Sequence, residues 1–130
     1  MPSSSIGVCF VIGMKGPAGH EVLGVTEWPR KITAHPKDKI FWAILNTTDS
    51  TVNVSLSKFV KLGQRIRVID PLDFHPDPPG RSAHVRAGAP GVIKAVVKKS
   101  AGYGLYAYTI LIDGRAALDP ELEIERPSAL

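Results

Sequence analysis

Four histidines and one cysteine are the side chains of this sequence best suited to bind a transition metal. The histidines are His20, His35, His75 and His84. Their spacing matches no short metal-binding motif, so only the fold could bring them together, with Cys9 or Met14 as a further ligand. The sequence therefore predicts histidines in ordinary surface and turn positions and no metal or other cofactor. A metal site built from non-standard histidine ligands is the alternative.

The carboxylates near the C-terminus form the main group that could supply acid–base catalysis. They are Asp113, Asp119, Glu121, Glu123 and Glu125. The alternation Glu-Leu-Glu-Ile-Glu places the glutamates on the solvent face of a strand, away from any buried nucleophile. The sequence also contains no Gly-x-Ser-x-Gly, no Walker-type loop and no His-Glu-x-x-His. We therefore predict no catalytic residues and a protein that is not an enzyme.

Cys9 is the only cysteine of the chain. One cysteine excludes an intrachain disulfide and every Cys-x-x-Cys site. Because Cys9 lies in an apolar run of Ile, Val and Phe, we expect an inert thiol in the core and not a reactive nucleophile. The aromatic side chains, Trp28, Trp42, Tyr103, Tyr106 and Tyr108, are likewise predicted to be core and corner residues and not a ligand box.

A cationic cluster around Phe59 is the one candidate binding site for an anion or an acidic partner. Its members are Lys58, Lys61, Arg65 and Arg67. No RNP-type aromatic motif accompanies the cluster, and three aspartates follow it closely, so a solvated strand face is favoured and nucleic-acid binding is disfavoured. The formal net charge of +4 bears on association and solubility and does not indicate a fold.

The composition predicts one all-β domain that spans residues 1–130. Hydrophobic residues make up 44% and charged residues 22%, as in an ordinary globular protein. Eleven prolines and twelve glycines favour many short elements joined by turns over long helices. No apolar run is long enough to span a membrane, and residues 1–19 form an extra strand and turn without the flanks of a signal peptide, so we expect a cytoplasmic protein.

Period-two alternation predicts the strands. They are expected at Ile6–Met14, Lys31–His35, Ile40–Leu45, Thr51–Ser57, Ile66–Ile69, Ser82–Arg86, Val92–Lys98, Tyr106–Ile112 and Glu121–Glu125. The polar segment Asn46–Ser50 predicts a turn that makes Thr51–Ser57 the hairpin partner of Ile40–Leu45. Asp113-Gly114 predicts a second turn, and residues 70–81 a proline-rich loop that Phe74 pins to the body.

Two of these strands, Ile6–Met14 and Ile40–Leu45, are apolar on both faces. We expect Ile40–Leu45 to be a central strand with cover on both sides. Ile6–Met14 is either covered on both faces or lies at an interface between subunits. A small sandwich has little material to cover so many apolar faces, and the pattern therefore favours self-association.

The order and spacing of these segments resemble those of cupredoxin-like Greek-key sandwiches. Pro36–Trp42 and Asn46–Ser50 are similar to the family's turn, Val-x-Trp run and Asn/Asp-rich loop. Gly104–Tyr108 resembles its Gly-x-Tyr-x-Tyr strand, and Glu121–Glu125 its closing strand. The resemblance covers residues 31–126 and implies an all-β Greek-key β-sandwich.

The type 1 copper centre of that family uses a histidine after the Asn/Asp-rich loop, and then a cysteine, a second histidine and often a methionine after the tyrosine strand. The first ligand position falls near Asn53 and the cysteine position near Ile110, while residues 112–120 contain neither His nor Met. The resemblance therefore implies a cupredoxin-like domain that lacks the type 1 copper ligands.

These observations together predict a non-enzymatic cupredoxin-like module that binds protein or has a structural role and that associates with itself. Its expected partners are an unidentified protein and a second copy of the chain. Two alternatives stay open, which are metal binding through the histidines and polyanion binding through residues 58–67.

Overall fold

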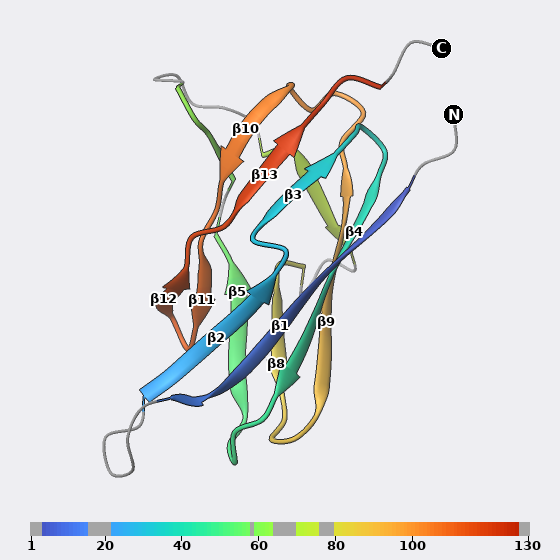
Figure 1. Cartoon of the computed structure of the whole chain (residues 1–130). Helices are drawn as coiled ribbons and strands as arrows, with labels where there is room; N and C mark the ends of the chain where they lie inside the picture. Colours follow the sequence, from blue (N-terminus) through green and yellow to red (C-terminus); the bar gives the residue numbers. More distant parts are fainter. Residues whose placement is uncertain (1–3, 16–21, 58, 64–69, 76–79, 128–130) are drawn as a thin grey trace.

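The computed structural model, described for residues 4–15, 22–57, 59–63, 70–75 and 80–127, contains strands and no helix within those ranges (Figure 1). This confirms the predicted all-β class. The strands are β1 (Ser5–Lys15), β2 (Val22–Trp28), β3 (Lys31–Ala34), β4 (Lys39–Asn46), β5 (Val52–Leu56), β6 (Val60–Lys61), β7 (Leu72–His75), β8 (Ser82–Val85), β9 (Pro90–Val97), β10 (Gly104–Ala107), β11 (Ile110–Ile112), β12 (Arg115–Leu118) and β13 (Glu121–Ile124). A search of the same residues for a helix long and apolar enough to cross a membrane finds none.

One layer is a five-stranded sheet in the order β2-β1-β4-β9-β7. Its middle strand β4 runs parallel to β1 and antiparallel to β9, so the predicted central position of Ile40–Leu45 is confirmed. On one face of β4 the side chains of Ile40, Trp42 and Ile44 are fully buried. Alternation places Phe41, Ala43 and Leu45 on the opposite face.

The other layer consists of two four-stranded sheets, in the orders β3-β13-β10-β6 and β12-β11-β5-β8. The two sheets lie end to end, because the chain passes from one to the other between β5 and β6, between β10 and β11, and between β12 and β13 (Figure 1). Packing of this layer against the five-stranded sheet gives the β-sandwich that the sequence predicts.

Trp42 on β4 joins the two layers at the centre of the core. Its indole Nε1 donates a hydrogen bond of 3.2 Å to the hydroxyl of Tyr108, which satisfies a polar group that would otherwise be buried without a partner. The ring of Trp42 also packs on Phe59 and Phe74, with centroids 6.4 Å and 6.0 Å away. One large side chain therefore contacts residues from three distant segments.

Tyr106, Tyr108, Ile110 and Ile112 are all buried, as their period-two spacing predicts. The strand they define is nevertheless broken between β10 and β11, where the two smaller sheets meet. It ends at the predicted Asp113-Gly114 turn, whose residues have φ angles of 50° and 80°. Such positive φ values suit the two-residue hairpin that joins β11 to β12.

The prediction that Thr51–Ser57 forms a hairpin with Ile40–Leu45 is wrong. β5 belongs to the second layer and pairs with β11 and β8. The reason is Asn46, whose fully buried side chain donates to the carbonyls of Ser50 and Val85 at 2.8 and 2.9 Å. Its Oδ1 accepts from the N–H and hydroxyl of Thr48. These bonds turn the chain across the sandwich, away from β4.

The proline-rich segment is only partly a loop. Within it β7 pairs antiparallel with β9 at the edge of the five-stranded sheet, so the prediction of a loop throughout residues 70–81 is wrong. Phe74 pins the segment as predicted, since it is buried and packs on Trp42. Arg81 lies over the Phe74 ring and forms an ion pair of 2.7 Å with Asp70. The strand predicted at Ile66–Ile69 falls outside the described residues.

Replacing Asn46 by alanine should destabilise the protein by about 3 kcal/mol, because the carbonyl of Val85 and the N–H of Thr48 lose their buried partner. Chemical denaturation of the purified variant measures this change. Asn53→Ala is a matched control on β5, since the Oδ1 of Asn53 has no hydrogen-bond partner within the described part of the chain, and its effect should stay within about 1 kcal/mol. Equal losses in both variants would contradict the role given to Asn46.

Stability should fall at alkaline pH because of Tyr106. Burial raises the pKa of this phenol above its ordinary value of 10.0, and the nearby charge of Asp70 raises it further. The folded state therefore holds the proton more tightly than the unfolded state does. The resulting stabilisation is complete below pH 10.0 and is lost as the pH rises from there through the folded pKa.

The free energy of unfolding, measured by denaturant titration from pH 9 upward, should decline across that window. Tyr106→Phe is the control, since phenylalanine has no proton to lose and should flatten this part of the profile. The hydroxyl also donates a hydrogen bond of 2.8 Å to the carbonyl of Gly102, so the variant starts from a lower stability. An unchanged slope in the variant would contradict the assignment.

Candidate functional site

The predicted cationic cluster is only partly within the described residues. Lys61 lies on β6, where its side chain passes so close to Gly104 that a Cβ on that glycine would lie 2.7 Å from the Lys61 Cε. Lys58, Arg65 and Arg67 are outside the described residues. A binding site made by these four side chains therefore stays a prediction.

The histidines do not converge in the described part of the chain. His35 lies beside the buried Asp38, with its Nδ1 3.5 Å from the carboxylate, while His75 and His84 lie on β7 and β8, which belong to different layers. No group of three or more His, Cys, Asp or Glu side chains that could hold a metal ion occurs among the described residues. His20 is outside them.

The positions matched to copper ligands point to opposite faces of one sheet. Ile110 on β11 is fully buried in the core. Asn53 lies on β5 between the buried Val52 and Val54, and strand alternation therefore directs its side chain outward. These two positions do not face a common site.

The carboxylates lie on outer surfaces, as the alternation predicts. Glu123 lies 3.6 Å from the ammonium group of Lys31, and Asp119 accepts a hydrogen bond of 2.8 Å from the hydroxyl of Thr109.

The prediction that Cys9 is a core thiol is wrong, because this side chain is exposed. Cys9 shares β1 with Val8 and Phe10, which are buried, and alternation turns it to the other face of the strand. The apolar neighbours in the sequence indicated burial, but they line the opposite side of the sheet.

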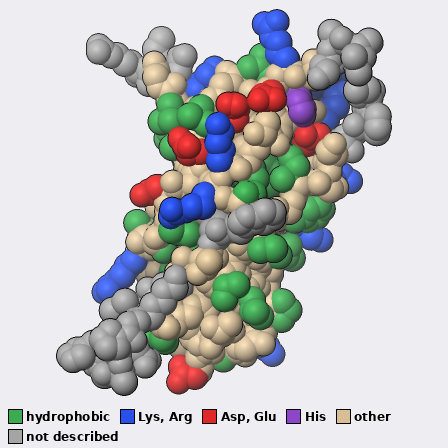
Figure 2. Space-filling model, viewed as in Figure 1, with side chains coloured by type: hydrophobic (Ala, Val, Ile, Leu, Met, Phe, Trp, Pro, Cys, Tyr) green, Lys and Arg blue, Asp and Glu red, His purple; other side chains and the backbone are tan. Residues whose placement is uncertain are grey.

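Cys9 belongs to an apolar surface on the outward side of the five-stranded sheet, here called the outer face. Two rows of paired residues form it: Cys9, Ala43 and Val92, and next to them Val11, Leu45 and Pro90. Val11, Leu45 and Val92 are 42%, 43% and 48% exposed. Hydrophobic side chains accordingly gather over β1, β4 and β9 in the lower half of Figure 2.

The prediction that Ile40–Leu45 is covered on both sides is therefore wrong for the described chain. The second layer covers only the face with Ile40, Trp42 and Ile44. Contiguous exposed apolar residues on a flat sheet are uncommon on a monomer and mark a contact surface. The outer face is consequently the strongest candidate for a functional surface. The sequence indicated it through β1 and β4, which carry apolar residues on both faces.

The fold is that of cupredoxin-like domains, as comparison with solved structures shows. A multicopper oxidase from Campylobacter jejuni is similar over 95% of this chain and 26% of its own, with a TM-score of 0.54 and 15% identity. A blue copper oxidase from Nitrosomonas europaea is similar over 91% of this chain and 43% of its own, with a TM-score of 0.51 and 10% identity. The Pseudomonas aeruginosa CupB2 chaperone is similar over 78% of this chain and 54% of its own, with a TM-score of 0.55 and 16% identity.

The chain thus spans between about a quarter and about half of the length of these proteins, and each of them contains further structure. No protein-family model and no curated protein sequence matches it. The predicted cupredoxin-like β-sandwich is confirmed. At identities this low, the likeness establishes the fold alone.

The prediction that the protein is not an enzyme is contradicted. Multicopper and blue copper oxidases are among the solved structures that share its fold. The lack of a known catalytic motif in the sequence was therefore no ground for excluding an enzyme, since this fold serves enzymes as one of their parts.

Proposed function

We propose that this chain is a cupredoxin-like binding domain that associates with a second copy of itself through the outer face. The observation that carries the proposal is the exposure of Val11, Leu45 and Val92 side by side on β1, β4 and β9. Removing such side chains from water contributes about 25 cal/mol for each Å² of apolar surface. Two flat sheets stack well because both present the same regular spacing of side chains.

The charges around the outer face suit a two-fold pairing. Lys39 and Lys94 are exposed at one end of the apolar rows, whereas Asp49, also exposed, follows the other end of β4. A two-fold axis that lies in the plane of the interface and perpendicular to β4 inverts the strand direction of the second copy. The lysine end of each copy then lies over the Asp49 end of the other, which offsets part of the repulsion between two positively charged chains.

The apolar rows are small compared with a standard interface, which buries about 800 Å² on each partner. The polar rim must therefore contribute, and we expect a dimer that dissociates at about micromolar concentration or above. As part of this proposal the chain folds as one domain and holds no type 1 copper, because the cysteine position implied by the resemblance falls near Ile110 and the sequence has no cysteine after Cys9.

Leu45→Lys should shift the chain to the monomer and weaken the dimer by about tenfold or more, because a buried leucine is lost and a charge is placed in the apolar contact. Sedimentation equilibrium over a range of concentrations measures this change. Val60→Lys is the matched control, since Val60 is 59% exposed but lies on β6 in the other layer, and it should dimerise like the wild type. A strictly monomeric wild type at high concentration, or equal effects of the two substitutions, would sink the proposal.

A further inference from the structure

A depression of about 480 Å³ lies on the solvent side of the second layer, where the chain passes from β12 to β13. Its lining includes Arg30, Lys31, Ala107, Leu118, Asp119 and Glu121. Glu121 pairs with Lys31 on β3 and with Ala107 on β10, so these three side chains lie in one row on the same face of their sheet. The depression is separate from the outer face, which belongs to the five-stranded sheet.

Contacts between segments that are distant in the sequence hold the depression in a defined shape. The N–H of Glu121 donates a hydrogen bond of 3.0 Å to the carbonyl of Arg30. The hydroxyl of Thr109, between β10 and β11, donates one of 2.8 Å to the carboxylate of Asp119. β2, which leads to Arg30, contacts β12. Because these segments are already ordered, a ligand that binds here does not have to order the backbone.

Two opposite charges of the depression are not neutralised within the described part of the chain. The guanidinium of Arg30 is exposed and has no ion pair there. The carboxylate of Glu121, which is half-buried, has none either, so the two groups do not neutralise each other. Lys31, by contrast, lies 3.6 Å from the carboxylate of Glu123. One positive and one negative group are therefore available to a ligand.

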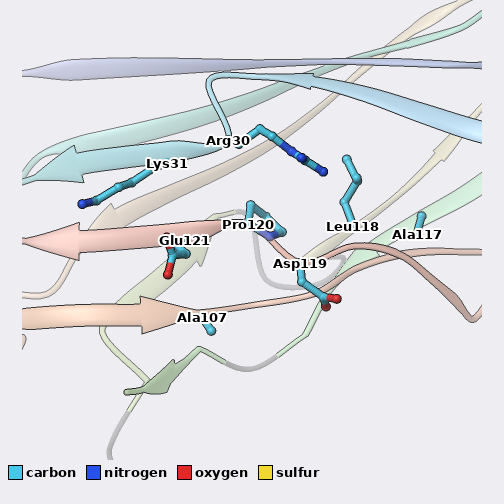
Figure 3. A pocket seen from close by; sticks show the side chains of 8 residues that line it. All are labelled: Arg30, Lys31, Ala107, Ala117, Leu118, Asp119, Pro120 and Glu121. Carbon is cyan, nitrogen blue, oxygen red and sulfur yellow. The ribbon is translucent and has the colours of Figure 1, made fainter. Parts of the chain in front are cut away.

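The positive and negative groups lie at opposite sides of the depression. In Figure 3 the Arg30 side chain extends from the start of β3 toward Leu118, whereas Asp119 and Glu121 lie on the side of the β12–β13 segment that faces β10. Leu118 and the exposed Ala117 add apolar surface to the lining. The arrangement is complementary to a small molecule that has an anionic end, an apolar body and a cationic end.

We propose that this depression binds a short apolar peptide of about two residues with both termini free. Its carboxylate contacts Arg30, whose guanidinium presents a planar fork of donors that fits a carboxylate at two points. Its ammonium group lies beside Glu121 and Asp119, and an apolar side chain of the peptide packs on Leu118. A single amino acid carries its two charges too close together to reach both sides. The site goes beyond the proposed dimer and does not depend on it.

Four probes test the site by NMR titration of the isotope-labelled wild-type chain: the dipeptide alanyl-leucine, its N-acetyl form, its C-terminal amide, and free leucine. The dipeptide should bind about fivefold more tightly than either capped form, because each cap removes one charged contact in a solvent-open site. Free leucine should bind more weakly than the dipeptide. The backbone N–H signals of Arg30 and Leu118 should shift and saturate as the dipeptide is added.

Two substitutions separate the charged contacts. Arg30→Gln should abolish the preference for the free acid over the amide and keep the preference for the free amine. Glu121→Gln should do the reverse. Arg86→Gln and Glu125→Gln are the matched controls, since both side chains are exposed and follow β8 and β13, and they should leave all affinities unchanged.

The proposal is overturned if the dipeptide causes no saturable shifts at about 10 mM, or if the capped forms bind the wild-type chain as tightly as the dipeptide. These two results need no variant and therefore stand even if a substitution impairs folding. Shifts confined to other parts of the chain, or equal behaviour of Arg30→Gln and Arg86→Gln, would also overturn it. Equal binding of free leucine and the dipeptide would assign the site to an amino acid and contradict the peptide.

Discussion

The contact between Trp42 and Tyr108 is the constraint on which the rest of the structure depends. It joins the central strand of the five-stranded sheet to the break between the two smaller sheets through a hydrogen bond in the core. Phe59 and Tyr108 stack on each other with centroids 4.3 Å apart, and Phe74 brings in the edge strand β7. Because the indole of Trp42 faces the second layer, Ala43 and Leu45 must face outward.

The outer face follows from this one-sided arrangement. A sandwich of this size covers one face of each sheet, and β1 and β4 carry more apolar side chains than one covered face accommodates. The outer face consists of the apolar side chains that the second layer does not cover.

Alternation in the sequence predicted the inward faces of β5, β11 and β13, because period-two spacing is a local property that survives folding. The partner of each strand could not be predicted from local spacing. The crossing from β4 to β5 depends on a bond from Asn46 to Val85, a residue far along the chain, so the local turn signal favoured a hairpin. The alternation predicted no strand at β12, because Ala116 and Ala117 give no alternating pattern.

The sequence indicated the candidate surfaces only in part. Two-sided apolarity indicated that β1 and β4 needed cover, but residue types alone could not say which side the second layer would take. Cys9 was assigned to the core for that reason. No sequence pattern marks the position of Arg30 beside Leu118, since it results from parallel pairing between β3 and β13, a long-range contact.

The central claim is that the outer face is covered by a second copy of the chain, and Cys9 lies within that face as a natural reporter. The rate at which a small maleimide alkylates Cys9 in the folded wild-type chain, measured over a range of protein concentrations, tests the claim most directly. The rate should be high in dilute solution and should fall as the concentration rises through the dissociation constant of the dimer. A rate that stays the same at every concentration would contradict the account.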